Sequence, residues 1–241
     1  MNRNASLVQQ QVHTAWDAVR TGLQKMYPSS DVRPSSGYDI FEFDHTVGDD
    51  DVKFNVRPIV FMLPERAAHS SPSLYVAVKG WLSFEGPDLR SKPLRTRSFG
   101  TEVGYFRSKR EVVEHVYGAH YDLDEAKTGH PVFHAQISPQ MDLLASVNEQ
   151  FRREWIAQDR VTPILPNVRT PSAQMDVFSV ITQLCADHLL TETSSSEVKQ
   201  AFEKMRTATA FFVGAAHRME YLNANIAPHC YRSTHWYSGA A

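Results

Sequence analysis

Between residues 38 and 137, apolar and polar residues alternate in a series of short segments. Such alternation places apolar side chains on one face of a strand and polar side chains on the other. The connections at residues 48–51, 64–72 and 86–93 contain the turn-forming residues Gly, Pro or Asp. Consecutive strands joined in this way favour an antiparallel meander. The expected strands lie at residues 38–45, 52–57, 74–84, 99–106, 115–124 and 130–137.

Helical spacing of apolar residues marks both ends of the meander. Val8, Val12, Trp16 and Val19 recur at intervals of three or four residues before Pro28, which predicts an amphipathic helix. After residue 141 the period changes again, and three C-terminal helices are expected. The sequence therefore predicts one α+β domain over residues 1–241, with a helix at 6–27, an antiparallel sheet at 37–138, helices at 141–223 and an aromatic-rich tail at 224–241.

Two pairs of residues are expected to start the last two helices. Thr170 and Pro171 suit an N-cap and a first helical turn, because proline lacks the N–H group that this turn leaves unpaired. Ser194 and Glu197 have the spacing of a capping box. The helix behind them, at residues 198–222, is expected to be the longest of the chain.

Composition narrows the classes of protein. The chain has 25 Lys and Arg against 27 Asp and Glu, a net charge of −2, which argues against a broad phosphate-binding surface. Its two cysteines, Cys185 and Cys230, lack the spacing of a zinc site, and so small a number favours a reducing compartment. Neither a signal peptide nor a membrane-spanning run is evident, so we expect a cytoplasmic protein with no membrane association.

A cluster of histidines marks the candidate site, since four of the eleven histidines fall between residues 115 and 136. With a loop at residues 125–129, alternation puts Tyr121 and Phe133 on one face of a hairpin and His120, Asp122 and His134 on the other. We expect His120 directly opposite His134, with Cβ atoms about 4.5–5.5 Å apart. His120, Asp122 and His134 are the predicted catalytic residues.

Three interpretations of this face remain open. In the first interpretation, it is a solvated sheet surface, as antiparallel sheets commonly have. In the second, it is a metal site in which Asp122 is the third ligand, while His130 and Asp124 lie farther along their strands. In the third, it is a metal-independent pair that divides general acid and base roles, as phosphodiester hydrolysis requires. No compact Cys/His set is present, so we expect no bound metal or other cofactor. The basic residues expected to hold a phosphate are Arg107, Lys109, Arg110 and Lys127.

Other constellations are weaker. Arg110 and His115 resemble a family of helical ribonucleases in their Arg-x4-His spacing alone, and strand-like segments flank them here. Cys185 and His188 lie three apart on a predicted helix, where buried packing is the simpler interpretation. Arg169 precedes a predicted helix start, a position suited to anions. Three residues of the tail are candidate ion ligands: His229, Cys230 and His235.

His130-Pro131 follows a helix and an antiparallel meander and precedes the C-terminal helices. In this order of elements, over about residues 6–190, the chain resembles the ubiquitin-conjugating fold. That family carries His-Pro-Asn followed closely by a catalytic cysteine, whereas Val132 follows here and the next cysteine is Cys185. The resemblance therefore implies a catalytically inactive relative that binds a protein partner.

The leading hypothesis is a binding or accessory subunit of a protein complex. Residues 210–216, AFFVGAA, are apolar almost all round, and a helix of this kind must be buried on every side. We therefore expect a protein partner or a homo-oligomer through the C-terminal helices, with nucleic acid as a less favoured partner. The alternative is a hydrolase or nuclease, metal-independent or metal-assisted, that uses His120 and His134.

Overall fold

The computed structural model describes residues 3–26, 40–44, 51–63, 74–85, 94, 96, 98–109, 112–123, 133–152, 154, 156–159, 169–172 and 174–210. A helix precedes six antiparallel strands and three later helices, which confirms the predicted α+β class. The helices are α1 (Arg3–Met26), α2 (Leu143–Phe151), α3 (Val177–His188) and α4 (Ser196–Ala208). The six strands are β1 (Phe41–Asp44), β2 (Asp51–Leu63), β3 (Leu74–Glu85), β4 (Ser98–Lys109), β5 (Val112–Leu123) and β6 (Phe133–Ile137).

Two short strands that the sequence did not predict complete the sheet. β7 (Ile156–Asp159) runs parallel to β5, and β8 (Arg169–Pro171) pairs antiparallel with β6. The order of the sheet is β1-β2-β3-β4-β5-β6-β8, with β7 beside β5. The prediction that Thr170 and Pro171 begin a helix is therefore wrong. Proline is tolerated in β8 because this strand is at the edge of the described sheet, where one row of N–H groups has no partner.

The helix starts and ends differ from the predicted ones. Asp176 caps α3 by accepting a 2.7 Å hydrogen bond from the Ser179 N–H. Ser195, not Ser194, caps α4, and its Oγ accepts from the Val198 N–H at 3.3 Å. Ser194 Oγ instead accepts from a backbone N–H in the preceding turn, which removes it from the capping box.

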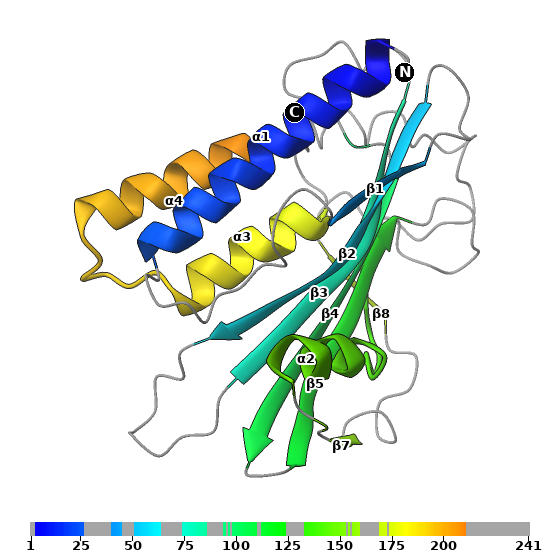
Figure 1. The fold of residues 1–241 in the computed structure, drawn as a ribbon, viewed down its shortest axis with the longest axis vertical. Coiled ribbons are helices and arrows are strands. Elements are labelled where there is room, and N and C mark those ends of the chain that lie inside the picture. Colours follow the sequence, from blue (N-terminus) through cyan, green and yellow to red (C-terminus); the bar gives the residue numbers. More distant parts are fainter. Residues whose placement is uncertain are drawn as a thin grey trace.

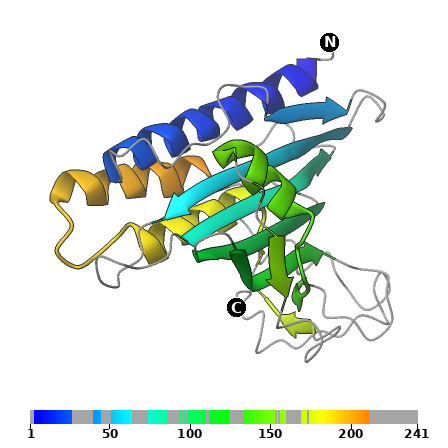
Figure 2. The same cartoon turned by 60° about the horizontal axis from the view of Figure 1, so that its bottom comes forward.

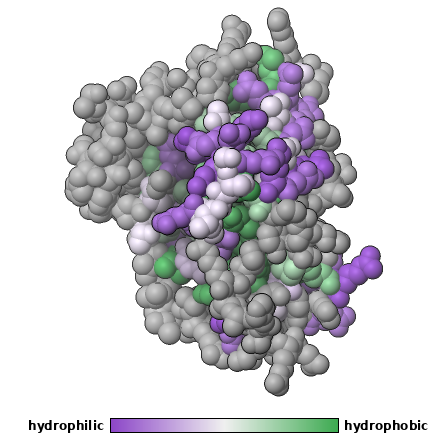
Figure 3. Space-filling view, turned by 90° about the vertical axis from the view of Figure 1, so that its left-hand side faces the viewer, coloured by the Kyte–Doolittle hydropathy of each residue, from purple (hydrophilic) through white to green (hydrophobic). Residues whose placement is uncertain are grey.

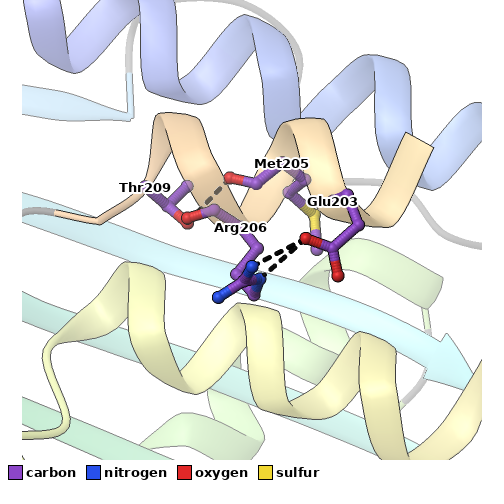
Figure 4. A network of polar contacts seen from close by, with 4 residues as sticks. All are labelled: Glu203, Met205, Arg206 and Thr209. Carbon is purple, nitrogen blue, oxygen red and sulfur yellow. Dashed lines mark hydrogen bonds and ion pairs between the residues drawn. The ribbon is translucent and has the colours of Figure 1, made fainter. Parts of the chain in front are cut away.

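The last described helix is shorter than predicted. α4 ends at Ala208, where the Thr209 hydroxyl donates to the Met205 carbonyl at 2.9 Å and Arg206 pairs with Glu203 (Figure 4). The prediction of one continuous helix through residue 222 is therefore wrong. Residues 211–241, which include most of the apolar segment behind the accessory-subunit hypothesis, lie outside the described residues.

The sheet separates two layers of helices (Figures 1 and 2). α1, α3 and α4 lie on one face, and the large buried rings of this core include Trp16, Phe54 and Phe178. Phe41 joins them: its ring centroid is 5.7 Å from that of Phe54 and 6.2 Å from that of Phe178. Among the described helices, none is long and apolar enough to cross a membrane.

α2 covers part of the opposite face with a smaller apolar cluster. Leu143, Leu144 and Val147 of this helix pack against residues of β2, β3, β4 and β5 that point away from the main core. The members contributed by the strands are Val60, Tyr75, Ala77, Phe106 and Val113. The remainder of this face, toward Glu85, Ser98 and Leu123, is lined by polar side chains.

The chain reaches α2 by crossing the sheet at a pair of opposed glycines, Gly104 and Gly118. The Ser138 N–H donates to the Gly118 carbonyl at 3.0 Å. A Cβ atom on Gly118 would collide with the Ser138 carbonyl and lie 2.7 Å from His115 Nε2. The close approach of the two backbones therefore requires glycine at residue 118.

Gly118→Ala is expected to destabilise the protein by about 1–3 kcal/mol, because the added methyl group overpacks against backbone. Gly22→Ala is the matched control, since its new Cβ atom would meet Met205 at 3.4 Å inside a helix, where alanine gains up to about 1 kcal/mol over glycine. Urea unfolding of both variants measures the difference. Equal stabilities of the Gly118→Ala and Gly22→Ala proteins would contradict the requirement for glycine where residues 138–140 pass over β5.

Asp176 links the stability of α3 to pH. Its side chain is fully buried, and burial raises its pKa to about 7 in spite of hydrogen bonds from Ser179 and Phe178. A carboxyl group with a raised folded-state pKa stabilises the protein when protonated, so its contribution is lost as pH rises from about 4 through about 7.

We expect the free energy of unfolding attributable to Asp176 to fall with pH at a slope approaching about 1.4 kcal/mol per unit near pH 5–6. Asp176→Asn keeps an oxygen for the Ser179 N–H but does not ionise, so this variant loses that slope. Urea titrations at closely spaced pH values test the prediction. Identical slopes for the variant and the wild type would contradict it.

Candidate functional site

The candidate site lies on the face of the sheet that α2 leaves partly uncovered. The register pairs Asp122 of β5 with His134 of β6, and His120 with Gln136. Directly paired residues share a face, and alternate residues on one strand do as well, so His120, Asp122 and His134 point the same way. The prediction that these three side chains share a face is confirmed.

The predicted register itself is wrong by two residues, because His120 is opposite Gln136 and not His134. A shift of two keeps every side chain on its original face. In the observed register Leu123 is opposite Phe133, and both pack on the main core. Alternation along a strand determines the face of each residue, but the packing of such pairs determines the register.

Asp122 lies between the two histidines. Its Oδ1 atom is 2.9 Å from His134 Nε2, and its Oδ2 atom is 3.8 Å from His120 Nε2. The imidazole centroids are 5.9 Å apart, with an interplanar angle of 70°. One donor atom from each residue can be chosen so that all three lie within 4.8 Å of one another. The three side chains therefore converge on one small volume.

Burial distinguishes the members of the site. The His134 side chain is 2% exposed, whereas those of His120 and Asp122 are 30% and 31% exposed. Asp122 Oδ1 is buried and has no hydrogen bond of proper geometry to the described residues, although His134 Nε2 is close. The site is thus closed on the His134 side and open on the His120 side.

Polar and aromatic side chains on neighbouring strands continue this face. Lys79 of β3, Glu102 of β4 and His120 are in register side by side. Lys79 Nζ is 3.1 Å from Glu102 and also pairs with Asp142, next to the first residue of α2. Burial opposes the charge of Lys79, yet its two carboxylate partners raise its pKa above the ordinary value.

Trp81 lies near the site because only Gly100 separates it from Asp122 in the sheet. Gly100 is opposite Trp81 on one side and Asp122 on the other. A Cβ atom on Gly100 would lie 2.5 Å from the indole Nε1, so the indole occupies the space above this residue. Lys53 Nζ lies over the same ring, 4.6 Å from its centroid.

The donor set suits a divalent metal ion. Two ligands about 2.0–2.1 Å from a tetrahedral ion are about 3.3 Å apart, and Asp122 Oδ1 and His134 Nε2, at 2.9 Å, would need to separate only slightly to admit one. Imidazole and carboxylate ligands suit zinc, iron or manganese, and three protein ligands leave further coordination positions for water. The expectation of no bound metal was based on Cys/His spacing alone, which does not register ligands gathered across strands.

The predicted phosphate-binding residues do not gather here among the described side chains. Arg107 is opposite Leu74 and Glu114, toward the other end of the strands from Asp122. Arg169 is in β8 and not at a helix start. The other predicted phosphate-binding residues lie outside the described residues or have undescribed side chains: Lys109, Arg110 and Lys127. Asp124 and His130, which were expected farther along the histidine face, also lie outside the described residues.

The other predicted constellations are structural where the chain is described. His115 is buried on β5, with its ring 5.6 Å from that of Phe106 under α2. Cys185 is buried in α3, and burial raises the pKa of its thiol to about 12, which keeps it protonated. His188 is half-buried beside Tyr105. His229, Cys230 and His235 lie outside the described residues.

A groove on the other layer of the molecule offers no comparable chemistry. It runs between α1 and α4, beside the ion pair of Lys25 and Glu197. Hydrophilic side chains dominate the upper part of the coloured surface in Figure 3, which views the molecule from the side where α1 ends and α4 begins. Its charged residues are Asp17, Lys25, Glu197 and Lys204.

Comparison with known proteins provides no family for this chain: no family model, no curated protein and no solved structure matches it.

His134→Ala is expected to destabilise the protein by about 1–3 kcal/mol, because it leaves the buried Asp122 Oδ1 atom without its partner. His120→Ala is expected to cost less than about 1 kcal/mol, since that side chain is partly exposed and its pairing is long. Thermal melts of the metal-free variants compare the two. A larger loss for His120→Ala would reverse the assignment of the closed and open sides.

Proposed function

We propose that this chain is a metal-dependent hydrolase whose divalent ion is held by His120, Asp122 and His134. The observation that carries the proposal is the placement of Asp122 between two imidazoles, with all three donor atoms within 4.8 Å. Two neutral imidazoles and one carboxylate provide three ligands with a total charge of −1. A divalent ion bound to them would leave the site with a net charge of +1.

A metal explains this arrangement better than a metal-independent histidine pair. In the observed register Asp122, and not His120, is the cross-strand neighbour of His134. General acid and base roles divided between the histidines require both of them to reach the substrate, yet His134 is buried. A metal ion can instead be held by the buried His134 on one side and the partly exposed His120 on the other, with solvent access from the His120 side.

The open side favours hydrolytic chemistry. His120 and Asp122 are each about one-third exposed, so water and substrate have access to the coordination positions that the protein leaves free. A divalent ion there polarises a carbonyl or phosphoryl oxygen and lowers the pKa of bound water. The substrate class is therefore an ester, amide or phosphate ester.

We expect the wild-type protein to bind one equivalent of Zn²⁺ or Co²⁺ per chain in isothermal titration calorimetry. His134→Gln, His120→Ala and Asp122→Asn each remove one ligand and are expected to weaken binding at least 100-fold. His188→Ala is the matched control, because this partly exposed histidine on α3 is not part of the site.

Hydrolysis is measured on the same proteins with p-nitrophenyl acetate and bis(p-nitrophenyl) phosphate. The metal-loaded wild type is expected to turn over one of these probes, and the Asp122→Asn protein to lose that activity. A wild-type protein that binds neither ion more tightly than the His134→Gln, His120→Ala and Asp122→Asn proteins would refute the proposed function.

A further inference from the structure

Glu102 is a carboxylate on the strand beside the open side of the site. It is on β4, directly opposite His120, and shares its face. Paired Cβ atoms at such positions lie about 4.5–5.5 Å apart. The Glu102 side chain is 37% exposed, so it is in contact with the same solvent as His120.

The residues around Glu102 restrict where its carboxylate can lie. Its alternate neighbour on the same face is Gly100, and the Trp81 indole occupies the space above that glycine. Lys79 flanks Glu102 on the side away from His120, at 3.1 Å. Glu102 therefore has an ammonium partner on the β3 side and His120 as its neighbour on the β5 side.

The ion pair with Lys79 does not by itself explain why a carboxylate lies at residue 102. Lys79 also pairs with Asp142, a contact between the sheet and the residue before α2. An exposed ion pair contributes little to stability. The second carboxylate is thus available for chemistry on the open side of His120.

Resting on the proposed metal-dependent hydrolysis, we propose that Glu102 is the general base of this site. Its carboxylate accepts a proton from the attacking water while the water oxygen forms a bond to the carbonyl carbon or phosphorus of the substrate. The protonated carboxyl group then donates that proton to the leaving group as its bond breaks. The step balances without an oxidant or a further reactant.

The test begins with a probe that does not require a known substrate. Azide is an anion that takes an open position on Co²⁺ and changes its visible spectrum. Because Glu102 is the cross-strand neighbour of His120, in the proposed site its charge lies beside that position, where it would oppose azide binding. In the Co²⁺-loaded protein, Glu102→Gln is expected to tighten azide binding about five- to tenfold, with Co²⁺ affinity changed less than threefold.

Glu42→Gln is the matched control. Glu42 is also a partly exposed carboxylate on this sheet with a cationic partner, Arg57, but β1 is three strands away from β4. The same change of charge there is expected to leave azide affinity unchanged. Equal azide affinities in the Glu102→Gln and Glu42→Gln proteins would overturn the placement of Glu102 at the open position.

Turnover tests the chemical role. For the probe that the wild type hydrolyses, Glu102→Gln is expected to lower kcat at least 100-fold with little change in KM, and Glu102→Asp to restore part of the loss. A Glu102→Gln protein with wild-type kcat overturns the general base, although the proposed function then stands. A wild type that binds no metal instead refutes the proposed function itself.

Discussion

The pairing of β4, β5 and β6 over one apolar core determines the direction of every side chain in the candidate site. Phe133, Leu123 and Tyr121 pack against the main core from these strands, and their alternate neighbours must therefore point to the opposite face. Once these residues are buried and Leu123 pairs with Phe133, His134 and Asp122 meet across β5 and β6. The geometry of the site is thus a consequence of the packing on the other side of the sheet.

The placement of α2 keeps this face open. The chain passes from β6 over Gly118 and Gly104, so α2 packs on the part of the sheet around Phe106 and Ala77. Lys79 then fixes the start of the helix through Asp142. Residues 138–142 form a border between the apolar part of this face and the part with the histidines. A helix that began nearer to His120 would cover the site.

Alternation was sufficient to predict the meander and the membership of the site, because burial of one sheet face imposes a period of two. It could not predict the register. Pairing His120 with His134 or with Gln136 leaves the same faces buried, and the choice depends on packing between distant residues such as Leu123 and Phe133. Glu102 and Trp81 were missed for a related reason, since their proximity to the site requires knowledge of which strands are neighbours. At Thr170 local preference for a helix start competed with edge pairing to β6, and pairing prevailed.

Burial differs between the two sides of Asp122, where the proposed ion would bind. In the metal-free protein, Asp122 Oδ1 lies 2.9 Å from His134 Nε2 but makes no hydrogen bond of proper geometry with the described residues. A divalent ion placed between them must compete with this contact, but it gains His120 as a further ligand from the open side. The difference between the two states therefore falls mainly on the His120 side chain, which is partly exposed and has room to move. In the proposed site, the buried His134 of β6 would hold the ion on the closed side, and the partly exposed His120 and Asp122 of β5 would complete its coordination on the open side.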